Sequence, residues 1–284
     1  MLRRRRYAVV GGKEILMSSG SWWEEFIDGL KVISKDRTLI YLDREYFGQK
    51  EVWLALGRAY DKNVASKEVV DDWIEYLSNN ATRIEKLRVA YLNQELLDAL
   101  QYQPQITELI ISYGSKNYSD LTLLGQLPRL RKLEIEGFPE GASLDGLAQS
   151  ESLKELKVFS RKPVDFSPLP RIKALEKLEI GTGVDPAFRK TVKVSDLKFL
   201  SEMTNLTHLN IYALVPEDRD LSPLMNLTAL ETGWYYWFKG QKPSVEELSK
   251  ANPVFAKVYA TYLEHKKTDW TAEISIITKW TWKK

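Results

Sequence analysis

Asp220-Leu221-Ser222-Pro223-Leu224-Met225-Asn226-Leu227-Thr228-Ala229-Leu230 is the stretch that decides the fold, because a leucine occupies every third position after the aspartate. Side chains three residues apart lie on one side of a tight, roughly 3₁₀-like turn, where they can be buried together. The same spacing leads up to Leu130, Leu175 and Leu206. An aspartate stands just before each of the four runs, and we expect its carboxylate to accept from free backbone N–H groups of the turn. These residues are Asp120, Asp165, Asp196 and Asp220.

The runs lead into hexamers of the form L-x-x-L-x-[IV], in which apolar residues alternate as they do in a half-buried strand. Copies begin at Ile84, Ile106, Leu130, Leu153, Leu175 and Leu206, at spacings of 22, 24, 23, 22 and 31 residues. A degenerate seventh copy begins at Leu230, where Gly233 replaces the inner leucine and Tyr235 the β-branched residue. A period of this length predicts stacked units that bury a core only together.

These residues resemble the leucine-rich repeat family, and the wording D-L-S-P-L…N-L-T-x-L is similar to its short, internalin-like bacterial class. The resemblance covers residues 84–236. It implies an α/β leucine-rich repeat solenoid with a curved parallel sheet and a short 3₁₀ or irregular convex side. The family usually has an asparagine three residues after the hexamer, which ties adjacent turns together. This chain has Phe138, Arg161, Gly183 and Leu214 there, so we expect less regular loops.

The sequence divides into three segments that differ in their residue patterns. We expect a small α/β N-terminal capping unit over residues 1–80, about seven repeats over 81–238 and a C-terminal cap over 239–284. In the first segment Gly11-Gly12 predicts a hairpin turn. Ser21 to Glu24 has the spacing of a capping box and predicts a helix start. Residues 38–42 are expected to form a buried strand, and 69–80 a helix. An independent domain with its own ligand is the alternative for this unit.

The C-terminal segment predicts a helix that begins at Ser244 with a further Ser/Glu cap and ends at Asn252-Pro253. The following runs, Val254 to Leu263 and Ala272 to Trp282, are rich in β-branched and aromatic residues. They predict a β-rich cap, either a terminal hairpin or a pair of edge strands.

Composition excludes several classes of function. The 284 residues include 41 Lys+Arg against 39 Asp+Glu, so no general attraction to nucleic acid or to an anionic membrane is expected. Cysteine is absent, and the two histidines, His208 and His265, lack the partners of a catalytic triad or a metal site. We therefore expect no enzymatic activity, no cofactor and no metal. With neither a signal peptide nor a membrane span in the sequence, the expected location is cytoplasmic.

Solvent-facing side chains of the repeat strands are the candidate site, because positions three, five and seven of each copy point away from the core. They form three columns on the concave face. The flank from Lys86 to Lys177 alternates Lys and Glu, which predicts exposed ion pairs. Aromatic residues gather at the C-terminal end, and such residues are the preferred anchors of protein interfaces. Our predicted protein-binding residues are Glu134, Glu136, Lys157, Phe159, Glu179, Arg189, His208, Asn210, Tyr212, Trp234, Tyr236 and Trp237.

Two alternatives stay open for this surface. The C-terminal cap can cover the aromatic end instead of leaving it to a partner. The 31-residue spacing inserts about eight residues around Arg189, and this loop is either a partner contact or neutral drift.

The expected function is that of a non-catalytic protein–protein interaction module, monomeric when free. By resemblance, our hypothesis is an immunity protein that neutralises a bacterial toxin domain. The alternatives are an adaptor in a signalling assembly and, third, an enzyme with a site in the N-terminal unit.

Overall fold

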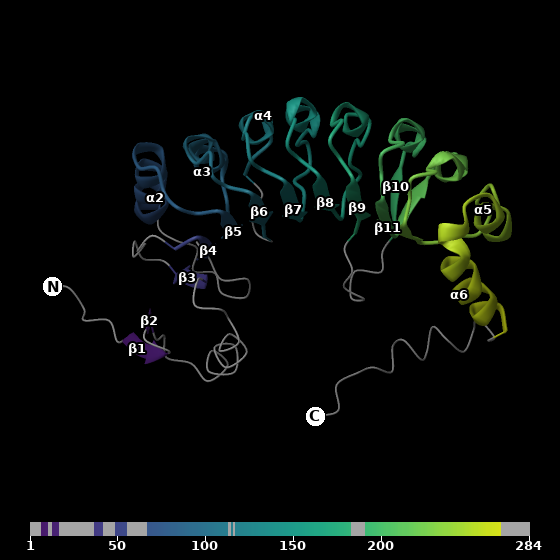
Figure 1. Ribbon diagram of the computed structural model, residues 1–284, viewed down its shortest axis with the longest axis horizontal. Coiled ribbons are helices and arrows are strands. Elements are labelled where there is room, and N and C mark those ends of the chain that lie inside the picture. The colour runs from purple at the N-terminus through teal and green to yellow at the C-terminus, as the bar shows by residue number, and fades with distance from the viewer. Residues whose placement is uncertain are drawn as a thin grey trace.

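The computed structural model describes residues 7–10, 13–16, 37–41, 49–55, 67–112, 115, 117–182 and 191–267. The predicted helix start at Ser21, the strand over 272–282, the glycine pair at 11–12 and the loop residue Arg189 lie outside the described residues. The solenoid is an arch with strands on its inner side and helices or tight turns on its outer side (Figure 1).

One parallel sheet forms the inner side of the arch. In the described part of the chain it contains nine strands in the order β13-β11-β9-β8-β7-β6-β5-β4-β3. Its strands are β3 (Arg37–Tyr41), β4 (Glu51–Ala55), β5 (Lys86–Ala90), β6 (Glu108–Ile111), β7 (Lys132–Glu136), β8 (Glu155–Phe159), β9 (Lys177–Gly181), β11 (His208–Tyr212) and β13 (Thr232–Tyr235). Within the repeats, equal positions of the hexamer pair from strand to strand, so the predicted register is confirmed.

Two small sheets complete the strand inventory of the described residues. The predicted N-terminal hairpin is present as β1 (Tyr7–Val10) and β2 (Lys13–Leu16), which pair antiparallel. Beside the main sheet, β10 (Val192–Val194) pairs parallel with β12 (Leu214–Pro216). The second pair lies where the spacing is longest, and β10 follows the inserted residues.

The outer side consists of short helices. These are α2 (Lys67–Asn79), α3 (Gln94–Ala99) and α4 (Thr122–Gly125), with 3₁₀ turns at Leu100–Tyr102, Asp145–Gln149, Leu169–Arg171, Lys198–Glu202 and Ser222–Asn226. The aspartates act as expected: Oδ1 of Asp120, Asp165, Asp196 and Asp220 each accepts from the backbone N–H two residues later, at 2.8–2.9 Å. Both the three-residue rhythm and its capping are therefore confirmed.

Glycine permits the closest approach between outer turns. A Cβ built on Gly125 would lie 2.1 Å from the carbonyl oxygen of Gly146, and a Cβ on Gly146 would lie 2.3 Å from the backbone nitrogen of Thr122. Since such distances are far inside van der Waals contact, these neighbouring turns can stack as they do only without side chains at both positions.

The sheet begins earlier than the first recognisable hexamer. Strand β4 pairs with β5, and α2 lies between them in the chain, in the outer-side position of a repeat. Trp73 and Leu77 of α2 are buried in the same core cluster as Leu54 and Ile84. Strand β4 and helix α2 thus form one more strand-and-helix unit of the solenoid, which the leucine spacing does not reveal.

The C-terminal cap is helical where described. Helix α5 (Val245–Ala251) begins at the predicted Ser244 capping box, and a 3₁₀ turn (Pro253–Phe255) leads into α6 (Ala256–Lys267). The prediction of a β-rich run from Val254 to Leu263 is therefore wrong. Phe255, Val258, Tyr259 and Tyr262 follow the spacing of one helical face and pack on the core, and this period outweighs their β propensity. In the described ranges, no helix has the length and apolar content needed to cross a bilayer.

Candidate functional site

The concave face carries three side-chain columns on consecutive strands, as the register predicted. Of the predicted site residues, β7 holds Glu134 and Glu136, β8 holds Lys157 and Phe159, and β9 holds Glu179. Strand β11 holds His208, Asn210 and Tyr212, β13 holds Trp234, and Tyr236 and Trp237 follow directly. The structure thus brings eleven of the twelve together, while Arg189 lies outside the described residues.

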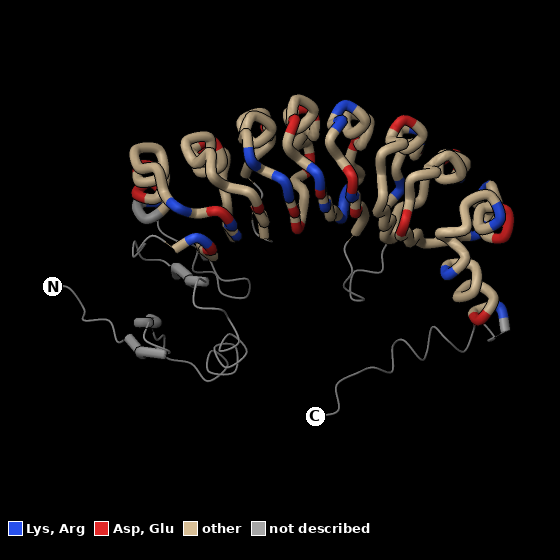
Figure 2. The backbone as a smooth tube through the Cα atoms, viewed as in Figure 1, with Lys and Arg blue, Asp and Glu red and all other residues tan. Residues whose placement is uncertain are grey.

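The flanking column is an ion-pair ladder. Lys86 Nζ lies 2.8 Å from Glu108 Oε1, and the Glu155 carboxylate forms ion pairs with Lys132 Nζ at 3.5 Å and Lys177 Nζ at 3.9 Å. Blue and red positions accordingly occur side by side on neighbouring strands in Figure 2. Each exposed pair stabilises by only about 0–1 kcal/mol.

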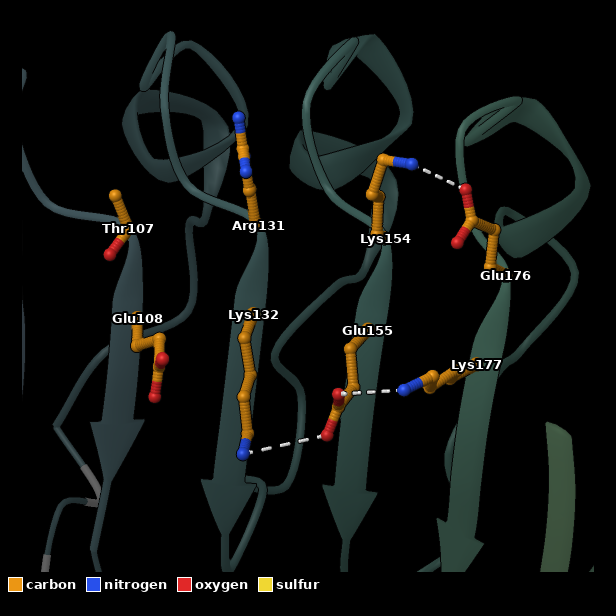
Figure 3. A pocket seen from close by; sticks show the side chains of 8 residues that line it. All are labelled: Thr107, Glu108, Arg131, Lys132, Lys154, Glu155, Glu176 and Lys177. Atoms are coloured by element: carbon orange, nitrogen blue, oxygen red, sulfur yellow. Dashed lines mark hydrogen bonds and ion pairs between the residues drawn. The ribbon is translucent and has the colours of Figure 1, made fainter.

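A pocket lies over the N-terminal ends of the central strands (Figure 3). It is lined by Thr107, Glu108, Arg131, Lys132, Lys154, Glu155, Glu176 and Lys177. The side chains form two rows, one from the residues that enter the strands and one from the flanking column. Lys154 pairs with Glu176 in the upper row, and the flanking ladder forms the lower one. Most charges of this pocket are therefore already compensated.

Arg88, on β5 in the middle column, interacts with three neighbouring side chains. Nη2 of Arg88 lies 3.0 and 3.1 Å from the two carboxylate oxygens of Glu136, and its Nε donates to Ser112 Oγ at 2.7 Å. The guanidinium lies 4.9 Å from the ring centroid of Trp53, within cation–π range. Trp53, on β4, was missed from the sequence because no hexamer marks that strand. It extends the middle column by one aromatic residue.

A second network crosses β8, β9 and β11. Lys157 Nζ lies 2.8 Å from Glu179 Oε1, and Tyr212 donates to Glu179 Oε2 at 3.2 Å. Desolvation raises the pKa of Glu179, but the hydrogen bond and charge of Lys157 outweigh it, so the pKa is lowered overall. Burial lowers the pKa of Lys157, but the hydrogen bond and the charge of Glu179 outweigh it, so this pKa is raised overall. Desolvation, together with Glu179, raises the pKa of Tyr212 to about 12, so its hydroxyl remains a donor. This part of the face is fixed by ion pairs and hydrogen bonds within the chain.

Glu134 differs from these carboxylates. Among the described residues it makes no hydrogen bond or ion pair, although it is half-buried. Its cross-strand neighbour Lys157 is directed to Glu179, and Arg88 is directed to Glu136. Desolvation by burial raises the pKa of Glu134; the charge of Lys157 opposes this and that of Glu136 adds to it. The Glu134 carboxylate therefore lies in the middle of the face without an ion-pair contact within 4 Å.

The aromatic end is partly covered. Phe159 was expected to face solvent, and that expectation is wrong: its side chain is only 7% exposed, with its ring centroid 6.1 Å from that of Tyr212. Opposite Phe159 in the sheet stands Gly181, which has no side chain, so the ring has room to fold down beside Tyr212.

The remaining aromatic residues form a stack at the end of the sheet. Trp237 contacts Trp234 edge-on at 6.1 Å between ring centroids and stacks with Tyr236 at 6.4 Å. Tyr262 and His265 of α6 also pack against Trp237. The cap therefore covers part of this cluster, as one of the two interpretations foresaw, while Tyr236 remains 45% exposed.

The surroundings of the described His, Asp and Glu side chains bear on metal binding and catalysis. Within the described ranges, no group of three His, Asp or Glu side chains could hold a metal ion. The ring nitrogens of His208 lie 2.6 Å from Thr232 Oγ1 and 2.9 Å from Asn210 Nδ2, and Nε2 also lies 3.8 Å from Glu179 Oε1. What the arrangement can do is present a fixed pattern of charge and aromatic surface.

No protein-family model matches the sequence, and no curated protein matches it significantly. Solved structures are similar to it. An internalin (inlF) from Listeria monocytogenes is 19% identical, with a TM-score of 0.46, over 66% of this chain and 54% of its own. Internalin C2 (inlC2) of the same organism is 21% identical, with a TM-score of 0.41, over 61% and 66%. A chain of the mouse RP105/MD-1 complex is 15% identical, with a TM-score of 0.39, over 65% and 42%.

This chain therefore spans less than two thirds of the length of each of these structures. The fold follows from the chain's own features: leucines at a fixed period, strands paired in one register, and aspartate-capped 3₁₀ turns on the outer side. The protein is a leucine-rich repeat solenoid.

Proposed function

We propose that this protein is a non-catalytic binding module that holds a partner protein on its concave face. The observation that carries the proposal is the pairing of a fixed polar network, Lys157–Glu179–Tyr212, with the exposed aromatic end at Tyr236. Pre-organised polar groups lose little entropy on binding, and aromatic rings bury much area with few rotors to freeze. Both properties favour recognition of a protein surface.

The partner class that we favour is a toxin domain, which makes the protein an immunity protein that acts in the cytoplasm as a monomer. The resemblance to a bacterial repeat class and the lack of a catalytic set in the sequence support this choice. An adaptor in a signalling assembly would use the same face, so the two functions differ in partner and not in site.

Affinity capture followed by cross-linking tests the binding module. Purified full chain is used as bait, and cross-linked peptides locate the contact on the chain. Tyr236→Ala should reduce capture by about tenfold or more, as expected of an interface anchor. Tyr102→Ala is the matched control, because Tyr102 is also an exposed tyrosine, at 52%, but lies on the outer side.

Co-expression separates the partner classes. The product of the neighbouring reading frame is expressed with and without this chain in a susceptible bacterium. Growth inhibition that this chain relieves, and that the Tyr236→Ala variant relieves less well, supports the immunity function. A captured partner without toxicity supports the adaptor instead.

A further inference from the structure

We propose that the partner protein places a basic side chain, Arg or Lys, over Glu134 and the adjacent Ile110 in the middle of the concave face. The inference rests on the proposed function and specifies the chemistry of the partner.

Charge pairing on the face is the first step. Each Lys and Arg that the described strands β5 to β9 present on this face lies within 4 Å of a carboxylate: Lys86 of Glu108, Arg88 of Glu136, Lys132 and Lys177 of Glu155, and Lys157 of Glu179. Of the carboxylates on the same strands, Glu134 is the one without such a contact. Glu134 is thus the carboxylate of the central face that lacks an ion-pair contact within 4 Å, and its position is fixed by the β7 backbone.

Binding of a partner protein would increase the energetic cost of the unpaired Glu134 carboxylate. A docked protein would remove the remaining water from the carboxylate, and a fully buried, unpaired charge is strongly unfavourable. The cations whose charges act on Glu134 are those of Lys157, Lys132 and Arg88, and each of them lies within 4 Å of another carboxylate. A cation supplied by the partner would offset this desolvation cost and leave the ion pairs of the face intact.

Ile110, the neighbour of Glu134 on β6, favours a basic side chain of the partner that has a long aliphatic stem. Ile110 on β6 pairs directly with Glu134 on β7 and is half-buried at a solvent-facing position. Lys and Arg bury an aliphatic stem while keeping the charged head apart from it. Ile110 fits the stem and Glu134 the head, so the two neighbours together match one amphipathic side chain.

Peptide selection with the full chain tests this inference separately from the binding function. A phage-displayed library of random linear peptides is panned on the immobilised protein. Affinities of the selected peptides are then measured for the wild type, Glu134→Gln, Glu108→Gln and Tyr236→Ala. Glu108 is the matched control because it is a glutamate one strand away on the same face but already paired with Lys86.

The inference expects selected peptides rich in Arg or Lys whose affinity falls about tenfold or more with Glu134→Gln, while Glu108→Gln leaves it within about twofold. Peptides that lose affinity with Tyr236→Ala but not with Glu134→Gln overturn the inference and leave the binding function standing. Peptides insensitive to both variants, or a library that yields none, count against both.

Discussion

Phe255 of the C-terminal cap occupies the place that the missing leucine leaves at Gly233. A Cβ on Gly233 would lie 2.8 Å from Phe255 Cε1, and Phe255 contacts Tyr235 edge-on at 5.2 Å between ring centroids. Both departures from the repeat wording in the last copy thus serve one purpose, since the cap ring needs the glycine beneath it and the tyrosine beside it.

Restoring the repeat consensus at this position should harm the protein. We expect Gly233→Leu to lower the free energy of unfolding by about 1–3 kcal/mol, because the added side chain overpacks a filled site. Urea denaturation followed by circular dichroism measures the change. Combining it with Phe255→Ala should recover part of the loss, since truncating the ring opens space for the leucine. A stabilised Gly233→Leu single variant would contradict the account.

Asn252 ties the cap to the last repeat. Its buried amide donates to the carbonyl oxygens of Leu224 and Leu227, and its Oδ1 accepts from the backbone of Val254. Asn252→Ala leaves these carbonyls unsatisfied and should cost about 1–3 kcal/mol. Hydrogen exchange of α6 amides should accelerate with it. Asn226→Ala is the exposed control and should leave both measurements unchanged.

The Lys157–Glu179 pair predicts a stability that depends on pH. The pKa of Glu179 is lower in the folded protein than its ordinary value of 4.5, so folding favours the ionised form. The stabilisation is therefore complete above that value and is lost as pH falls through the folded-state pKa. Because water partly screens the pair, we expect wild type to exceed Glu179→Gln by about 1 kcal/mol at pH 7. Urea unfolding at about pH 3 should find the difference reduced.

A pH-independent difference would contradict the assignment to Glu179. The control is Glu176→Gln, because Glu176 pairs with Lys154 at an exposed position and should change stability little.

Glu134 predicts the opposite sign. Its pKa is raised by burial, so its ionised form destabilises the fold at neutral pH, and this cost is removed as pH falls through the raised value. We expect Glu134→Gln to leave the free energy of unfolding unchanged or raise it by about 0–1 kcal/mol at pH 7. Denaturation of the free protein measures this. A clear loss of stability would show that Glu134 supports the fold itself and would weaken its assignment to binding.

The sequence was sufficient for the repeats because their burial is local. Leucine at every third position allows one outer turn to be read residue by residue, and the hexamer fixes which side of a strand is apolar. Register, aspartate caps and concave columns followed from that pattern alone. The helix of the first unit was predicted over 69–80 and is present as α2. Its strand β4 was not predicted, because Trp53 and its neighbours have no leucine spacing to mark them.

Exposure at the candidate site could not be read in the same way. Alternation placed Phe159 and Tyr212 on the concave face, yet the first is buried and the second half-buried, since an exposed position in one strand can be covered by side chains of the next. Lys157 pairs with Glu179 and Arg88 with Glu136, and neither pairs with Glu134. These pairings depend on distances between three or more strands.

What the sequence by itself determined is the solenoid: its period, its strand faces and the aspartates that cap its turns, all of which depend on residues a few positions apart. Tertiary structure alone decided that Gly125 and Gly146 let outer turns touch and that Phe255 replaces a leucine at Gly233. Each of these depends on the shape of a surface built by distant segments, and a steric fit between two surfaces has no periodic signal in either of them.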